Sequence, residues 1–301
     1  MKGDASMQRR QTRGDRIIDT INYILLGSFV LVIIYPLYFS LIASFSDPRA
    51  VYQGRVIVLP ADLTLAGYKK IFANADIWRS YMNSLIYTTL GTGLNLAFTV
   101  PLAFALSRKE LPGAGVYMKL ATITMYFYGG IIPLYFVVRG LRMLDTMWSL
   151  ILPTVIATYN MIIARSFFLS GIPEELREAA FLDGCGYLRF FFHIALPLSK
   201  SMIAVLALFY GARHWNAYFE ALIYLNSKSK YPLQLVLRTI LIDSQASLSM
   251  TEDATTVADK QQLVDLLKYG CVIVSSVPML IFYPFIQKHF VKGMMIGAVK
   301  G

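Results

Sequence analysis

The sequence has few charged residues. Asp, Glu, Lys and Arg make up 15% of its 301 residues, whereas hydrophobic side chains make up 56%. A soluble domain carries about 25% charged residues, so this chain has too few to cover a water-exposed surface of its size. The shortage argues against a cytosolic enzyme and directs attention to where the charges lie.

Residues that bind metals or act as nucleophiles are scarce as well. The chain has two cysteines and three histidines, and no Cys–His spacing typical of a metal site. It has no glycine-rich phosphate loop with its lysine, no His-Glu-x-x-His pattern and no nucleophile elbow. We therefore expect no catalytic residue, metal or cofactor in this chain, and no disulfide between Cys185 and Cys271. If the protein uses ATP, another chain must hydrolyse it.

The charges are grouped in blocks separated by long uncharged stretches. Because the hydrocarbon core of a bilayer needs about 20 apolar residues per helix, these stretches predict an all-α membrane protein. Their length and the lack of period-two alternation argue against a barrel. Six prolines within the stretches indicate kinks: Pro36, Pro101, Pro133, Pro153, Pro278 and Pro284. The six predicted transmembrane helices are 21–45, 81–107, 119–138, 147–170, 201–225 and 268–288.

The ends of the chain indicate its orientation. Residues 1–20 form a basic tail with Lys2, Arg9 and Arg10, which favours the cytoplasmic side, and the first span is too long for a signal peptide. Six spans within a domain over 21–290 return the tail 291–301 to the same side. The predicted location is a bacterial inner membrane with both termini cytoplasmic, and the net charge of +10 indicates contact with anionic lipid.

The predicted cytoplasmic loop 171–200 carries the most informative pattern. Pro173 suits a first helical turn, acidic residues follow it, and Gly184 stands where a helix would stop. The pattern predicts a short amphipathic helix over 173–183 outside the bilayer. Ala179 and Ala180 would let its backbone approach another protein closely. A solvated charged turn is the alternative interpretation.

This loop resembles the permease subunits of type I ABC importers. Glu178, Ala179, Ala180, Gly184, Ile194, Leu196 and Pro197 reproduce their E-A-A-x3-G-x9-I-x-L-P signature. The resemblance implies that the helix is a coupling helix held in a groove of a separate ATPase subunit. The coupling residues that it implies are Glu174, Leu176, Glu178, Ala179, Ala180, Phe181, Asp183, Gly184, Ile194, Leu196 and Pro197.

The resemblance extends over most of the chain. Residues 60–68 and 81–85 resemble the approach to the second helix of sugar permeases, and 215–218 with 222–225 resemble their fifth helix. The tail 287–301 is similar to the branch associated with complex or acidic oligosaccharides, including alginate- and pectin-type transporters. Gly67 departs mildly from that pattern, because Asn often precedes the Tyr.

The resemblance also implies a transport mechanism and partners. It implies alternating access, a second permease subunit, an ATPase dimer that binds ATP and Mg, and an extracytoplasmic solute-binding protein. No nucleic acid is expected. The binding protein would meet the predicted outer loops 47–80 and 226–267.

A sugar pathway needs aromatic faces and hydrogen-bonding groups inside the bundle. Arg213, Asn216 and Glu220 are spaced to share one stripe of a continuous helix, and an arginine there should face the interior or water. If the cargo contains uronate, Arg213 and His214 are candidate counter-charges. The candidate pathway residues are Asn83, Tyr126, Tyr128, Tyr159, Asn160, Arg213, Trp215, Asn216, Tyr218 and Glu220.

Structural roles remain open for each of these residues. Arg213 and Glu220 would also tie helices together, Trp215 and Tyr218 would suit the membrane interface, and Asn83 would suit interhelical hydrogen bonding. Three other functions also remain open. They are import of an amino acid, peptide or phosphate through the same loop, ion-coupled secondary transport with Glu220 as the intramembrane carboxylate, and a membrane enzyme, although no catalytic cluster lies in the spans.

Overall fold

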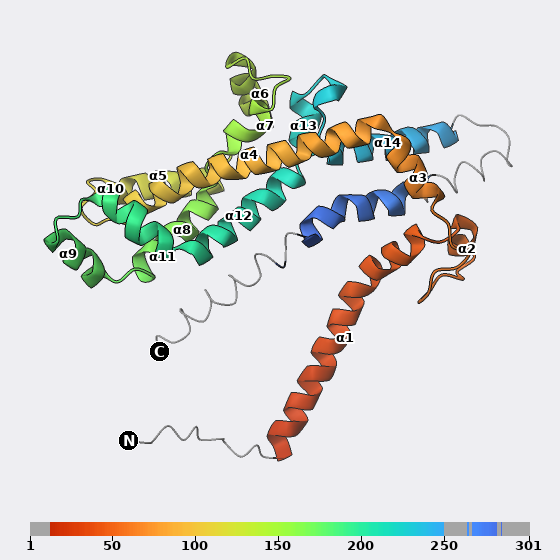
Figure 1. Cartoon of the computed structure of the whole chain (residues 1–301), viewed down its shortest axis with the longest axis horizontal. Helices are drawn as coiled ribbons and strands as arrows, with labels where there is room; N and C mark the ends of the chain where they lie inside the picture. Colours follow the sequence, from red (N-terminus) through yellow and green to blue (C-terminus); the bar gives the residue numbers. More distant parts are fainter. Residues whose placement is uncertain (1–12, 250–263, 265–266, 282–283, 285–301) are drawn as a thin grey trace. The chain divides into compact units, whose positions relative to one another are not determined.

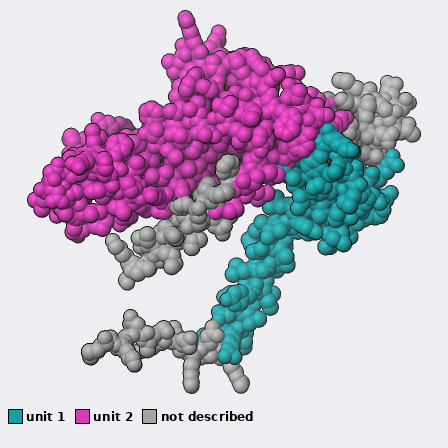
Figure 2. All heavy atoms as spheres, in the orientation of Figure 1, with its two compact units in different colours: residues 1–69, 251–273 teal, residues 70–250, 274–301 magenta. Residues whose placement is uncertain are grey.

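The computed structural model describes residues 13–249, 264, 267–281 and 284. Within these residues the regular structure is helical, apart from an isolated bridge between Ser46 and Leu63. The chain divides into two compact units, residues 1–69 with 251–273 and residues 70–250 with 274–301 (Figure 2). The predicted all-α fold is confirmed.

The first unit contains the long helix α1 (Arg13–Ser44), α2 (Pro48–Tyr52) and the start of α3 (Ala66–Ala73). Helix α2 begins at a strong signal, because the Asp47 side chain accepts a hydrogen bond from the Arg49 amide at 2.8 Å and Pro48 occupies the first turn. Ile42, Ala50 and Val56 form a small core that joins the end of α1 to the segment after α2.

The second unit is organised around α4 (Ala75–Leu106), with α8 (Thr158–Ser170) and α12 (Lys200–Trp215) packed alongside it (Figure 1). Asn74 caps the start of α4 by accepting the Asp76 amide at 2.9 Å. The core between these helices holds Phe104, Phe168, Leu206 and Tyr210. The remaining elements are α5 (Ala114–Tyr126), α6 (Ile131–Gly140), α7 (Trp148–Ile151), η1 (Leu152–Thr154), α9 (Glu174–Leu182), α10 (Tyr187–Phe190), η2 (Phe191–Ala195), α11 (Leu196–Leu198), α13 (Phe219–Tyr224), η3 (Lys228–Lys230), α14 (Leu233–Ser249) and a helix over Leu267–Ile281.

The structure confirms two of the predicted spans as single long helices. Gly14–Ser44 and Ala75–Leu106 are each long and apolar enough to cross a membrane. Three further spans appear as bent helix pairs, α5 with α6 at 114°, α7 and η1 with α8 at 48°, and Tyr187–Leu198 with α12 at 78°. Length and composition therefore allow up to five spans among the described residues, and the helix over Leu267–Ile281 covers only part of the predicted sixth span.

Three predicted spans were wrong as continuous helices. Span 119–138 breaks at 127–130, where Gly130 adopts φ +89°, a conformation that favours glycine. Span 147–170 breaks around η1, which contains Pro153. Span 201–225 ends at Trp215, because Asn216 caps α12 with its side-chain amide donating to the Ala212 carbonyl at 2.8 Å.

Several predictions fall outside the described residues. They concern most of the basic tail 1–20, the end of the last span beyond Pro284, the similarity of 287–301 and the tail 291–301. The predicted outer loop 226–267 is described over 226–249 and at 264 and 267, and residues 226–249 contain η3 and α14, which packs along α4.

Candidate functional site

The loop after α8 forms the predicted short helix. Helix α9 covers Glu174–Leu182 with Pro173 at its N-cap, and Gly184 follows it at φ +77°. The left-handed conformation of Gly184 turns the chain sharply after the helix, as the sequence predicted.

Helix α9 has one exposed face and one face turned toward the protein. Glu175, Glu178, Ala179 and Leu182 are exposed, and their spacing places them on neighbouring turns. Leu182 has 90% of its surface exposed. An apolar side chain this exposed at the end of a helix offers contact area to another protein.

The opposite face anchors α9 to the second unit. Ala180 is buried in the core that contains Phe104 and Phe168. Phe181 makes edge contacts with Tyr187 and Phe190, with ring centroids 4.8 and 6.2 Å apart. Phe181, one of the predicted coupling residues, is partly exposed and packs on these two rings.

The second half of the signature lies on the bent helix that follows. Ile194 and Leu196 pack against the same core as Ala180, whereas Pro197 is exposed in α11. Ile194 and Leu196 therefore stabilise the loop that contains α9. Among the other predicted coupling residues, Glu174, Leu176 and Asp183 are exposed.

Arg177, which the sequence analysis did not select, connects α9 to the loop after α4. Its guanidinium lies 2.6 Å from the Glu110 carboxylate, also pairs with Glu174, and covers the Phe181 ring at 5.3 Å. Burial disfavours its charge, but the Glu174 hydrogen bond and the Glu110 charge outweigh this and raise the pKa of Arg177. A backbone hydrogen bond at Glu110 and the Arg177 charge lower the pKa of Glu110. Both groups are therefore held ionised.

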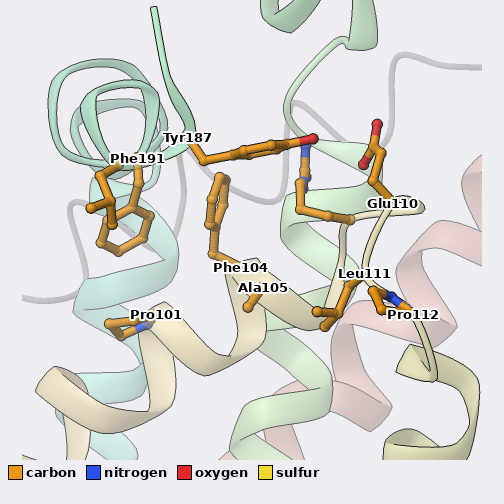
Figure 3. Close-up of a pocket in the computed structure, with 10 residues that line it drawn as sticks. Pro101, Phe104, Ala105, Glu110, Leu111, Pro112, Tyr187 and Phe191 are labelled. Carbon is orange, nitrogen blue, oxygen red and sulfur yellow. The ribbon is translucent and has the colours of Figure 1, made fainter.

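An apolar pocket of about 450 Å³ lies beside this ion pair, between the end of α4 and α10. Figure 3 shows the side chains of Phe104, Tyr187 and Phe191 gathered against it, with Glu110 and Leu111 on the loop after α4. The pocket wall is therefore made by the same elements that the Arg177–Glu110 pair joins.

A second cavity, of about 680 Å³, lies between the broken helices. This volume is within the range of ligand pockets, about 300–1,000 Å³. Tyr128, Tyr159, Arg213 and Glu220 line it, so four of the ten predicted pathway residues meet in one place. Thr124, Thr158 and Tyr224 also line it and were not predicted. The cavity combines aromatic rings, hydroxyl groups and one charge of each sign.

Arg213 and Glu220 reach this cavity in a different way from the one predicted. They do not share a stripe of one helix, because α12 ends before Glu220, which lies in α13. The turn between the helices brings the two charges to 3.9 Å, and both side chains stay partly exposed. They line the cavity and also form an ion pair with each other.

The other predicted pathway residues lie away from the cavity lining. Trp215 is buried against Tyr81 and donates to the Ser275 carbonyl at 2.9 Å. The Tyr218 ring is covered by Arg238 at 4.4 Å, and Asn216 caps α12. Tyr126 is exposed and Asn160 is buried.

Asn83 holds the N-terminal part of α4 to the segment around η3. It donates to the carbonyls of Ser229 and Tyr231 at 2.8 and 3.1 Å, and Tyr87 donates to the Lys230 carbonyl at 2.9 Å. Lys230 in turn pairs with Asp145 at 2.8 Å. Hydrogen bonds from Lys230 and Ser227 hold the pKa of Asp145 well below its usual value.

His214 points away from the cavity and toward α4. Its Nε2 lies 2.6 Å from the Asn95 side-chain oxygen, and it packs against Gly91. It is therefore not placed beside Arg213 as a counter-charge in the cavity lining.

Asn95 and Tyr210 satisfy the backbone at the break between η1 and α8. Asn95 donates to the carbonyls of Thr154 and Val155, both at 2.8 Å. The Tyr210 hydroxyl accepts from the Ala157 amide at 3.2 Å and bonds Thr99 at 2.7 Å. We call Asn95, Thr99, Tyr210 and His214 the break cluster. Their spacing in the sequence gives no sign that they converge.

The described residues contain no group of three or more His, Cys, Asp or Glu side chains arranged to hold a metal ion. Cys185 and Cys271 are both unpaired.

Comparisons with known proteins agree with these features. The model of a family described as binding-protein-dependent transport system inner membrane component matches residues 5–296. Protein LplC of Bacillus subtilis (strain 168) is 38% identical over 290 residues, which cover 96% of this chain and 97% of that protein. The polygalacturonan/rhamnogalacturonan transport system permease protein YtcP of the same organism is 39% identical over 288 residues, covering 95% and 99%.

A solved structure is also similar. It is described as a bacterial ABC transporter involved in the import of the acidic polysaccharide alginate, and one of its chains superposes with a TM-score of 0.80 at 31% identity. The match covers 93% of this chain and 98% of that one.

Proposed function

This chain belongs to the family of binding-protein-dependent transport system inner membrane components, and we propose that it is the permease subunit of an ATP-driven importer of oligosaccharides. Relatives of this kind are transport subunits and not enzymes. One similar protein is described as a polygalacturonan/rhamnogalacturonan transport system permease, and one similar structure as a transporter involved in the import of the acidic polysaccharide alginate. We propose the same class of cargo here.

The observation that carries the proposal is helix α9, which is fixed to the core on one side and exposed on the other. Its exposed face, with Glu175, Glu178, Ala179 and Leu182, is the surface that we assign to the ATPase. When ATP closes the two ATPase subunits, their grooves carry α9 along and tilt the spans, so that the cavity opens outward. Hydrolysis of the ATP, which the ATPase binds together with Mg, returns α9 and the spans to their starting positions.

We assign the cavity with Arg213 and Glu220 to the sugar pathway. Tyr128 and Tyr159 offer aromatic faces for pyranose rings, and hydroxyl groups offer hydrogen bonds. Because the Arg213–Glu220 contact is long at 3.9 Å and partly exposed, a uronate carboxylate can replace Glu220 on the guanidinium. A neutral sugar makes only hydrogen bonds to the same groups.

The remaining partners follow from this assignment. One such chain does not enclose a path for an oligosaccharide, so a second permease subunit pairs with it in the inner membrane, with anionic lipid around both. A solute-binding protein delivers the cargo to the outer segments 47–80 and 226–267. Both termini then lie in the cytoplasm.

Uptake by the reconstituted complex tests the proposal. We expect Arg213→Gln to lower uptake of oligogalacturonides at least tenfold, because a hydrogen bond to a charged group contributes about 1.5–3 kcal/mol. Uptake of a neutral oligosaccharide, if the complex accepts one, should change little. Arg139→Gln, at an exposed arginine outside the cavity lining, is the matched control.

Two results would contradict the proposal. Uptake that continues after ATP depletion and stops with an uncoupler would indicate an ion-coupled transporter. Tight binding of amino acids, peptides or phosphate, but not oligosaccharides, by the cognate binding protein would indicate another cargo.

A further inference from the structure

The contacts of α9 join it to α4 as well as to its own loop. Phe181 contacts Phe190, and the Phe190 ring lies 6.2 Å from that of Phe104, near the end of α4. The Arg177–Glu110 pair adds a second connection, because Glu110 lies in the short loop that follows α4. Helix α9 is therefore connected to this end of α4 through the Phe190 ring and through one ion pair with the loop that follows α4.

The ionic contact is built so that it resists separation. Only 12% of the Arg177 side chain is exposed, and the guanidinium lies between Glu110, Glu174 and the Phe181 ring. Arg177 Nε is buried and has no hydrogen-bond partner among the residues that the structure describes. Pulling α9 from the loop would leave this buried cation without the Glu110 carboxylate, which is unfavourable.

The far end of α4 is fixed as firmly. Asn83 and Tyr87 bond the carbonyls of the segment around η3, and the Ser84 hydroxyl accepts the Leu233 amide at 2.8 Å. Helix α4 is continuous between these two ends, over 32 residues. A displacement applied at Glu110 therefore reaches one continuous helix, which contains Pro101, and whose other end holds the proposed outer segment.

We propose that Arg177 and Glu110 are positioning residues that transmit the movement of α9 to α4, and through α4 to the outer segment around η3. The inference rests on the proposed function, because it takes α9 as the element moved by the ATPase. It adds a specific route that the coupling signature does not contain, since neither residue belongs to that signature. Arg177 then works within the permease and does not contact the ATPase.

The test is a double-mutant cycle in proteoliposomes that contain the complete transporter, with oligogalacturonides as the probe. Arg177→Gln and Glu110→Gln should each lower sugar imported per ATP hydrolysed about fivefold, because contacting residues couple at this scale. The double variant should be no worse than either single one, and Arg177→Lys should restore part of the ratio. Arg189→Gln, at an exposed arginine of α10, should leave the ratio unchanged.

Co-purification of the ATPase separates transmission from docking. All variants should retain the ATPase and its basal activity. Loss of the ATPase in Arg177→Gln, additive effects in the double variant, or an unchanged ratio in the single variants would each overturn the inference. Failure of the wild-type complex to import any oligosaccharide would instead contradict the proposed function. The double-mutant cycle would then be measured as the stimulation of ATPase activity by the solute-binding protein carrying its own cargo, and the same results would support or overturn the inference.

Discussion

Gly91 allows the close approach of α4 and α12 beside the break cluster. A methyl group at this position would lie 2.6 Å from His214 Nε2 and 2.8 Å from two ring carbons. Carbon atoms pack best at about 3.5–4.0 Å, so the imidazole of Gly91→Ala would have to move by roughly 1 Å. The ring is buried and bonded to Asn95, so this movement breaks the hydrogen bond.

The expected cost can be estimated. Overpacking costs about 1–3 kcal/mol and the hydrogen bond about 1 kcal/mol, whereas alanine is favoured over glycine within a helix by about 1 kcal/mol. The net destabilisation is about 2 kcal/mol, which for a chain of 301 residues corresponds to a thermal midpoint lower by about 3 °C. The assay is the thermal midpoint of the detergent-solubilised protein, followed by size-exclusion chromatography.

Gly93 provides the matched control on the same helix. A methyl group there would meet nothing within 4 Å, so Gly93→Ala should leave the midpoint unchanged or raise it slightly. Adding Gly91→Ala to His214→Ala should cause no further loss, since the ring it strikes is gone. Equal midpoints for the two glycine variants, or a full additional loss in the double variant, would refute the reasoning.

Two other predictions concern the docking face of α9 and the outer segment. Leu182→Ala should weaken ATPase binding about 30-fold, because burying a leucine contributes about 2 kcal/mol, and it should leave the thermal midpoint unchanged. Leu188→Ala, at another exposed leucine, is the control. Normal co-purification of the ATPase with the Leu182 variant would count against docking through α9. Asp145→Asn should speed hydrogen exchange in residues 226–232 at pH 7, because a carboxylate with a lowered pKa stabilises the fold above its unfolded pKa. The difference in exchange rate between variant and wild type should decrease once the pH falls below about 3.9, the pKa of Asp in the unfolded chain, and should vanish as the pH passes below the lower pKa of Asp145 in the folded protein. Equal exchange rates at pH 7 would show that Asp145 does not hold residues 226–232.

The sequence was informative where structure is set locally. Pro173, the early acidic residues and Gly184 define α9 within one turn at each end, so its bounds were predicted closely. The uncharged stretches predicted the two long apolar helices, Gly14–Ser44 and Ala75–Leu106, for the same reason, because the bilayer acts on composition over about 20 residues.

The interior of the bundle was less predictable. The prediction that Arg213 and Glu220 share a stripe assumed an unbroken helix. The helix instead ends at the Asn216 cap, and this cap depends on one conformation of the Asn216 side chain among several that the sequence allows. Asn83 and Trp215 carry the same amide and indole groups as sugar-binding residues, yet here they bond backbone carbonyls. Arg177 and Glu110 stand 67 positions apart, and only the folded loop brings them together.

The break cluster has a consequence for how the cavity opens. Polar backbone at a helix interruption normally makes a flexible joint, but here the carbonyls of Thr154 and Val155 and the amide of Ala157 are already occupied. These hydrogen bonds make the helix interruption rigid, and its residues Thr154, Ala157 and Thr158 line the cavity. The cavity that we assign to the sugar pathway is thus already shaped at this interruption, and we expect its opening to change only when whole segments move around it.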